Sequence, residues 1–288
     1  MKLIVVELFT GLTEKDVDIC LTVLAAAGIA CQTSGHSNCF TLSVNDEDRE
    51  IALFEIESYY RENKRLLHAP EYSMPPLDFT SGILAAIVVL AVHLAVIRYS
   101  GMTFFVKTFG ASASSILDGE HYRVVTALML HSGYPHLVGN MAGLILLAPL
   151  VCRRHGFGIG FLSILLSGAA GNYVNAHIYQ NDHISIGAST SIFGAIGILV
   201  IHRFADALHV SGMRIRPWMP IASGLCLLGL LSSGEHTDIL AHLFGFCCGM
   251  ATGYGIHRVV KTPPGFFYQV FSFSVFLIII FLSWTRLW

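Results

Sequence analysis

The chain has 288 residues, of which 54% are hydrophobic and only 12% charged, and its mean hydropathy is +0.64. These values are typical of a polytopic membrane protein and exclude an ordinary soluble one. The formal net charge of −2 gives no basic footprint for a nucleic acid, so we expect no nucleic-acid partner.

Charged side chains are concentrated at the amino-terminal end of the chain. Residues 1–71 carry 18 of the 36 charged side chains, which are 17 basic and 19 acidic. This segregation predicts a soluble head followed by a membrane body. The opening residues MKLIVVELFT contain a lysine, a short apolar stretch and then Glu7, which is unlike a secretory signal. We therefore expect the head to stay in the cytoplasm.

The head, residues 1–70, is predicted to be a small βαββα domain. A strand over residues 3–9 is followed by a helix over 13–27, by two strands around the turn GHSN, and by a helix over about 47–63.

Two helix starts in the head carry cap signals. Thr13 with Asp16 three residues later predicts a capping box, and Asn45 with Asp46 predicts a second cap. Residues 71–78, which include most of the segment PEYSMPP, are predicted to form a stiff polar linker.

The remaining chain contains seven stretches that are long enough to cross about 30 Å of hydrocarbon. They lie near residues 80–98, 135–152, 157–178, 186–203, 217–233, 237–257 and 266–284. The sequence thus predicts an all-α polytopic membrane protein, with a six-helix core over residues 79–260 and an additional carboxy-terminal transmembrane helix within 261–288.

Basic residues indicate the orientation of these spans. They lie before the first span and after the second, fourth and sixth, at Arg61, Lys64, Arg65, Arg153, Arg154, Arg203, Arg214, Arg216, Arg258 and Lys261. All of these would be cytoplasmic, which places the carboxy terminus outside. The loop 99–134 carries basic residues against this pattern, and we expect it to fold on the outer surface.

With this orientation, the second, fourth and sixth spans all begin at the outer face. Ser189 opens the fourth span, and His242 lies about one turn into the sixth, so both would sit about 5 to 10 Å below the surface at ~1.5 Å per residue. His136 and Asn140 share one face at the start of the second span. Polar groups inside a membrane are expensive and usually functional, so this shared depth favours a common site over separate structural roles.

Small residues would let these helices approach closely. Ala241, Gly245, Gly249 and Gly253 form a stripe at four-residue spacing in the sixth span. A hydroxyl nucleophile and an imidazole base could then come within hydrogen-bonding reach.

Other intramembrane chemistries fit the sequence less well. A zinc protease would require H-E-x-x-H, which is absent, and an aspartyl protease would require two Asp inside spans, whereas Asp182 and Asp238 lie at span ends. A transporter would require broken helices or paired charges at mid-membrane. The outer histidines match no metal-ligand spacing, and the cysteines include no C-x-x-C pair. We expect no metal and no cofactor.

Three motifs resemble those of the rhomboid family of intramembrane serine proteases. GASTSIFG at 187–194 resembles the nucleophile motif G-x-S-G, AHLFG at 241–245 resembles the histidine motif A-H-x-x-G, and HSGYPHLVGN at 131–140 resembles H-x4-H-x3-N. The resemblance covers about residues 78–260 and joins three separate spans in the expected order. Tyr122-Arg123 stands where many members have Trp-Arg.

The resemblance implies a role for each matching residue. Ser189 would be the nucleophile and His242 the general base and acid, without a carboxylate, and His136, Asn140 and the Ser189 amide would form the oxyanion hole. Phe193 would stack on the His242 ring, although an ordinary core or lipid-facing aromatic is an equal alternative. Gly187 belongs to the nucleophile motif, and His131 would be structural near the loop.

The activity that the resemblance implies is hydrolysis of peptide bonds in or next to transmembrane segments of membrane proteins, in the lipid bilayer. The protein would be a multi-pass protein of a bacterial inner membrane. One residue departs from the family pattern, because Thr190 stands where the family usually has Gly. This departure keeps a second hypothesis open, in which the chain is an inactive rhomboid-like protein that binds membrane clients.

Overall fold

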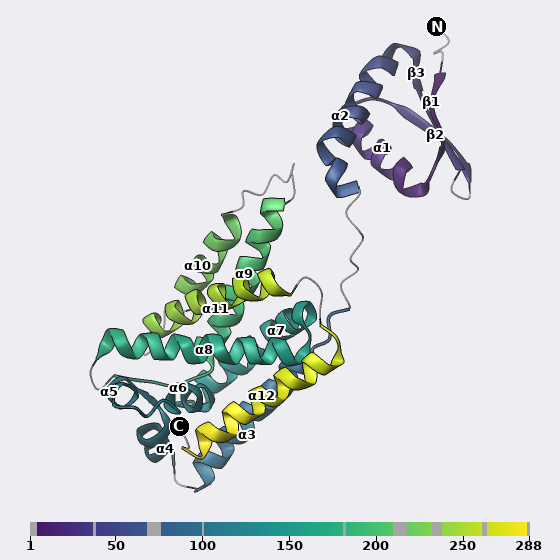
Figure 1. Ribbon diagram of the computed structural model, residues 1–288. Helices are drawn as coiled ribbons and strands as arrows, with labels where there is room; N and C mark the ends of the chain where they lie inside the picture. Colours follow the sequence, from purple (N-terminus) through teal and green to yellow (C-terminus); the bar gives the residue numbers. More distant parts are fainter. Residues whose placement is uncertain are drawn as a thin grey trace. The chain divides into compact units, whose positions relative to one another are not determined.

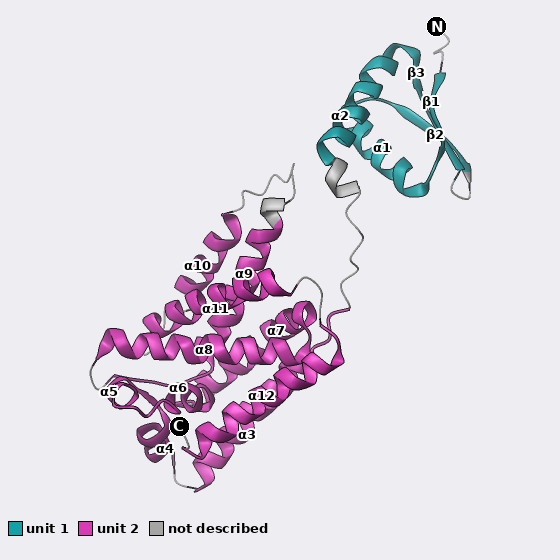
Figure 2. Cartoon of the chain, in the orientation of Figure 1, with its two compact units in different colours: residues 1–71, 209–214 teal, residues 72–208, 215–288 magenta. Residues whose placement is uncertain are grey.

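The structure is a computed structural model that describes residues 5–36, 39–67, 76–99, 101–180, 183–209, 218–231, 238–260 and 264–286. Most of the predicted linker lies outside these residues. The chain divides into two compact units, residues 1–71 with 209–214 and residues 72–208 with 215–288 (Figure 2).

The first unit is an α+β domain with the predicted order of elements (Figure 1). These are β1 (Val5–Leu12), α1 (Glu14–Ala26), β2 (Cys31–His36), β3 (Cys39–Asn45), the 3-10 turn η1 (Asp46–Asp48) and α2 (Arg49–Leu67). The strands form one antiparallel sheet in the order β1-β3-β2. Leu24 from α1, Leu42 from β3 and Ile56 from α2 are buried in its core, which joins both helices to the sheet.

One of the two predicted caps is present in this domain. The Asp16 amide donates to Thr13 Oγ1 over 3.2 Å, which is the capping hydrogen bond, and the Thr13 hydroxyl donates to the Asp16 carboxylate over 2.7 Å. The second cap is wrong. Asn45 is the last residue of β3 and makes no capping hydrogen bond, because its amide turns instead toward the Asp48 carboxylate. The helix therefore begins at Arg49 rather than near residue 47.

The second unit consists mainly of long helices (Figure 1). The long helices are α3 (Thr80–Tyr99), α7 (Tyr134–His155), α8 (Phe157–Tyr179), α9 (Ser189–His209), α10 (Met219–Leu231), α11 (Ile239–Val259) and α12 (Phe266–Trp284). Within the described residues, α3, α7, α8, α11 and α12 are long and apolar enough to cross a membrane. The fourth and fifth predicted spans are the helices α9 and α10. The protein is thus a polytopic helical membrane protein with a small amino-terminal domain, and the count of seven crossings stays a prediction.

The long loop before α7 is folded. It contains α4 (Met102–Phe109), β4 (Ala111–Ser112), α5 (Ala113–Leu117), α6 (Arg123–Thr126) and the 3-10 turn η2 (Ala127–Met129). Arg123 is buried, pairs with the Glu120 carboxylate and donates to the carbonyls of Lys107 and Gly110. Its charge therefore holds the loop together, which gives this basic residue a structural role.

Small residues bring α8, α9 and α11 into backbone contact. A Cβ placed on Gly249 would lie 2.1 Å from the Gly194 carbonyl oxygen, and one on Gly197 would lie 2.1 Å from that of Phe246. A Cβ on Gly171 would lie 2.8 Å from the Gly245 backbone. Real Cβ atoms do not approach so closely, so the crossings depend on glycine, as the small-residue stripe predicts.

Candidate functional site

The turn that precedes α9 is fixed by its backbone and by a short sheet. β5 (Ile184–Ser185) pairs antiparallel with β4, and the Gly187 amide donates to the Ala127 carbonyl over 2.9 Å. Gly187 has φ +121°, a region that favours glycine. The chain then enters α9 at Ser189. The loop before α7 and the sheet thus set where Ser189 begins its helix.

His136 and Asn140 of α7 lie directly beside this turn. A Cβ on Gly187 would be 2.6 Å from His136 Nε2 and 3.4 Å from Asn140 Nδ2, so only glycine fits there. Asn140 is buried, and its Nδ2 has no hydrogen-bond partner among the described residues. Buried donors are nearly always paired, so an unpaired one marks a position for a ligand atom or a water.

The imidazole of His136 has one nitrogen near Ser132 and the other near the turn. Ser132 Oγ lies 3.2 Å from His136 Nδ1. When the Ser132 hydroxyl donates to Nδ1, the proton of the neutral ring is on Nε2, the atom next to Gly187. In that tautomer His136 and Asn140 both present donors to the space around the turn.

His242 lies on α11 and is held by an aromatic ring of α9. The Phe193 ring stacks on the imidazole with 4.5 Å between centroids and 28° between planes, and both side chains are buried. Phe193 follows Ser189 by four residues, so the two share one face of α9. A Cβ on Gly245 would be 2.2 Å from the Thr190 carbonyl oxygen, which shows how closely the start of α9 meets this turn of α11.

His131 supports the peptide just before Ser189. It is fully buried, and its Nε2 accepts a hydrogen bond from the Ala188 amide over 3.4 Å. Burial, reinforced by the neighbouring His136 ring, lowers the pKa of His131 to about 4. The ring is therefore neutral near pH 7 and able to accept this bond. His131, His136 and Asn140 thus lie beside the turn formed by Gly187 and Ser189, and the Phe193–His242 pair lies one helical turn further along α9.

Comparison with known proteins identifies the fold family of this region. Residues 118–259 match the family model described as the Rhomboid domain. The chain is 29% identical over 140 residues to the rhomboid protein YdcA of Bacillus subtilis (strain 168), which covers 48% of this chain and 69% of that one. It is 29% identical over 162 residues to Rhomboid-like protease 3 of Toxoplasma gondii, with 56% of this chain and 61% of that one covered.

A plant relative is similar to the same degree. RHOMBOID-like protein 5 of Arabidopsis thaliana is 33% identical over 161 residues, with 52% of this chain and 51% of the relative covered. The region 118–259 belongs to the rhomboid family. The Rhomboid domain contains every residue of the site above, whereas the head, α3 and α12 lie outside it.

Thr190, the departure from the rhomboid pattern, is turned away from the turn. It is buried, and its methyl group fills the space over Gly171 of α8 and Gly245 of α11, since a Cβ on either glycine would be 2.8 or 3.0 Å from Thr190 Cγ2. The extra side chain therefore takes part in the crossing of three helices.

Two polar residues beside this rhomboid site are not part of the motifs. His93 of α3 is 2% exposed and lies edge-to-face with His131, 6.4 Å between centroids. A lone histidine in an apolar span was the available signal. Asp238 lies at the start of a span, and its carboxylate accepts hydrogen bonds from Asn175 of α8 and Ser185 of β5.

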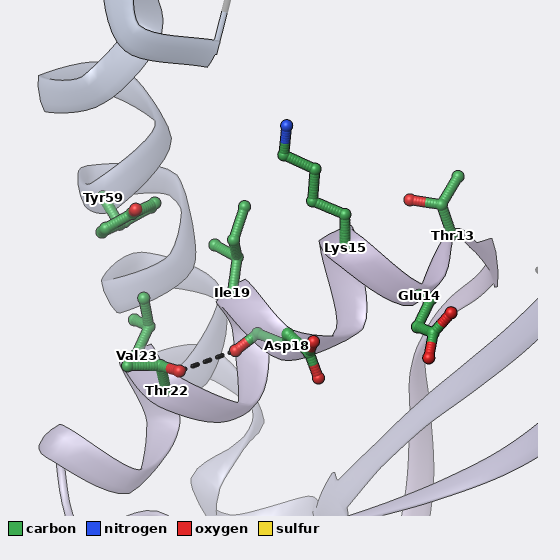
Figure 3. A pocket seen from close by; sticks show the side chains of 8 residues that line it. All are labelled: Thr13, Glu14, Lys15, Asp18, Ile19, Thr22, Val23 and Tyr59. Carbon is green, nitrogen blue, oxygen red and sulfur yellow. Dashed lines mark hydrogen bonds between the residues drawn. The ribbon is translucent and has the colours of Figure 1, made fainter. Parts of the chain in front are cut away.

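A hollow in the head contains none of these residues. It has a volume of about 670 Å³ and lies between α1 and α2 (Figure 3), lined by Thr13, Glu14, Lys15, Asp18, Ile19, Thr22, Val23 and Tyr59. Its walls carry mixed charge, and nothing in them resembles the rhomboid motifs. Over the described part of the chain, no group of three or more His, Cys, Asp or Glu side chains is arranged to hold a metal ion.

Proposed function

We propose that this rhomboid protein is a serine protease that hydrolyses peptide bonds in or next to the transmembrane segments of other membrane proteins. The observation that carries the proposal is the buried Asn140 Nδ2, which has no hydrogen-bond partner within the described part of the chain and lies beside the turn that leads into Ser189. An unpaired donor is destabilising in a folded protein unless something binds it. Acyl transfer provides such a partner, because an oxyanion forms next to the nucleophile.

The proposed chemistry uses residues that surround this turn. Ser189 Oγ attacks the scissile carbonyl while His242 takes its proton, and His242 then donates that proton to the leaving amine. The oxyanion accepts hydrogen bonds from Asn140 Nδ2, from His136 Nε2 and from the Ser189 amide, which is free in the first turn of a helix. Water, activated by His242, then hydrolyses the acyl-enzyme. Phe193 supports this scheme because it fixes the plane of the base.

A rival function, the binding of membrane clients without catalysis, rests on Thr190. The threonine side chain could block the nucleophile if it occupied the substrate space. It is instead packed against Gly171 and Gly245, which favours the enzyme.

The decisive experiment is labelling of the full-length protein in detergent with a serine-directed fluorophosphonate, combined with cleavage of a transmembrane model substrate in proteoliposomes. We expect Ser189→Ala to abolish both signals. The matched control is Ser191→Ala, because Ser191 lies in the same helical turn but faces Gly168 of α8. Cleavage that survives in Ser189→Ala would end the protease proposal, and an unlabelled, inactive parent would favour the rival.

We further propose that the head is cytoplasmic, that the carboxy terminus is outside, and that the protein resides in a bacterial inner membrane. The support is the distribution of Lys and Arg among the loops. A phosphatase reporter fused after Trp288 in a bacterial host should be active in the periplasm. An inactive phosphatase with an active cytoplasmic reporter at the same site would reverse the orientation.

A further inference from the structure

One carboxylate collects four hydrogen bonds at the start of α11. Asp238 Oδ1 accepts from the Ala241 amide over 3.0 Å and caps the helix. Its Oδ2 accepts from Asn175 Nδ2 over 2.9 Å, from His183 Nε2 over 2.6 Å and from the Ser185 hydroxyl. The side chain is therefore bonded to three segments beyond its own residue.

Two of these segments lead directly into the site, and the third, α8, packs beside it. Asn175 lies near the end of α8, and Ser185 belongs to β5, four residues before Ser189. Asp238 itself lies four residues before His242, whose amide donates to the Asp238 carbonyl over 3.1 Å. The carboxylate thus links the strand that leads to the nucleophile with the helical turn that bears the base.

A helix cap alone does not explain this arrangement. Capping uses one oxygen, and Ser or Asn caps a helix as well as Asp does. The three further donors converge on the other oxygen from α8, from β5 and from His183 just before β5. His183 is in turn stacked on Tyr179 at 3.7 Å between centroids, which fixes the direction of its Nε2.

The hydrogen bonds also keep the carboxylate charged. Burial raises the pKa of Asp238, but the bonds from Ser185, His183 and the Ala241 amide outweigh burial and bring the pKa below its ordinary value of 3.8. An ionised oxygen is a strong acceptor for several donors at once, whereas a neutral amide oxygen would hold them less tightly.

We propose that Asp238 is a positioning residue for the Ser189–His242 pair, and that its carboxylate sets the separation of nucleophile and base by tying β5 and α8 to the first turn of α11. This inference rests on the proposed protease function. Asp238 acts through the backbone, since its two oxygens are engaged by Ala241 and by the three side-chain donors. A misplacement of about 1 Å in such a pair can lower the rate by roughly 100-fold.

The kinetic test compares variants that keep the helix cap. Asp238→Ser retains an oxygen for the Ala241 amide but loses the acceptor for the three donors. We expect kcat in proteoliposomes to fall about 10- to 100-fold, with KM nearly unchanged, because alignment is lost while substrate binding is kept. His183→Ala should act in the same direction, and His183→Gln should restore much of the rate because its amide can still donate. If Asp238→Ser fails to fold, the two His183 variants carry the test with the cap intact.

The matched control breaks a different ion pair between helices. Asp206 of α9 accepts two hydrogen bonds from Arg154 of α7, at 2.9 and 3.0 Å, and lies 17 positions beyond Ser189 in its helix. Asp206→Ser should leave kcat near the parent value. An equal loss in Asp206→Ser and Asp238→Ser would show that any broken ion pair lowers activity, which would overturn the inference.

A second measurement does not require proteolysis. In a full-length variant whose seven native cysteines are replaced, Ser189→Cys provides a thiol whose alkylation rate by iodoacetamide is measured against pH. A nearby base shifts this profile, and His242→Ala should remove the shift. We expect Asp238→Ser to remove it too, and Asp206→Ser to keep it.

The pH profile has three possible outcomes, which bear differently on the positioning role and on the protease proposal. A profile that depends on both His242 and Asp238 supports the positioning role even if the parent protein cleaves nothing, in which case only the protease proposal fails. A profile that depends on His242 but not on Asp238 overturns the positioning role and leaves the protease proposal standing. A profile that depends on neither shows that the pair is not formed and overturns both.

Discussion

Phe193 and His242 lie face to face, with 4.5 Å between the ring centroids and 28° between the ring planes. The pair joins α9 to α11 and sets the plane of the imidazole relative to Ser189, one turn earlier in α9. Aromatic pairs of this kind contribute about 0.5 to 1.5 kcal/mol beyond the area they bury.

Phe193→Leu should lower kcat while leaving the fold intact. The substitution keeps an apolar side chain in the core but removes the ring that orients His242, and ~0.5 to 1.5 kcal/mol corresponds to a fall of about 2- to 10-fold. Phe161→Leu is the control, since Phe161 packs on Phe157, Phe273 and Phe276, away from the site. Equal kcat in Phe193→Leu and the parent would contradict an orienting role.

Asn140→Ala should separate activity from stability. We expect cleavage to fall about 10- to 1000-fold, or ~1.5 to 4 kcal/mol, because an oxyanion donor is lost. The free energy of unfolding should stay level or rise, because the amide removed has no partner among the described residues. The buried Asn172 is the opposite control, since its amide donates to the Val124 carbonyl over 2.9 Å. Asn172→Ala should lose stability and keep cleavage, and a loss of stability alone in Asn140→Ala would refute the oxyanion role.

His136→Ala should lower cleavage by a factor similar to that of Asn140→Ala.

Thr190→Gly should leave cleavage within a few-fold of the parent. The Thr190 methyl group fills space over Gly171 and Gly245, so its removal opens a gap and also places a glycine in a helix, at a combined loss of ~1 to 3 kcal/mol in unfolding free energy. Thermal unfolding in detergent measures this loss. Gly171→Ala should be less destabilising in the Thr190→Gly background than in the parent, because one of its two clashes is gone. A large gain in cleavage would instead place Thr190 in the substrate space.

Gln269→Ala should loosen α12 without changing catalysis. Gln269 Oε1 accepts hydrogen bonds from the backbone amides of Gly158 and Ile159 at the start of α8. Gln269 Nε2 donates to the backbone carbonyls of His155 and Pro264. Loss of these bonds should lower the unfolding free energy by ~1 to 3 kcal/mol. We expect a lower unfolding temperature in detergent and an unchanged kcat, and a matching fall in kcat would show that α12 supports the site.

The contribution of Asp238 to stability should depend on pH in one direction. Its pKa is below 3.8 in the folded protein, so the unfolded state binds its proton first as the pH falls. The difference in unfolding free energy between the parent and Asp238→Asn should therefore be constant above about pH 5. It should shrink as the pH falls below 3.8 and through the folded pKa. A difference that grows as the pH falls would contradict a lowered pKa of Asp238.

The motifs of the site could be predicted from the sequence because each is local. GASTSIFG, AHLFG and HSGYPHLVGN occupy continuous stretches, and an apolar run that begins with polar residues places those residues near one end of a helix. The capping box at Thr13 was equally local. The failed cap at Asn45 shows the limit of local patterns. Asn45 is the last residue of β3 and is paired with Val5 of β1, a long-range contact that the residues around Asn45 do not indicate.

The sequence by itself determined the membrane body, the small α+β head, the family resemblance and the residues of the proposed dyad. Only the tertiary structure decided that Thr190 turns toward Gly171 and Gly245, and that Asp238 gathers donors from α8 and β5. The physical reason is that a hydrophobic run fixes how deep each residue of its own helix lies in the membrane. The direction of a side chain depends instead on which neighbouring helices pack against it. Those contacts join positions 19 to 63 residues apart, and no local pattern records them.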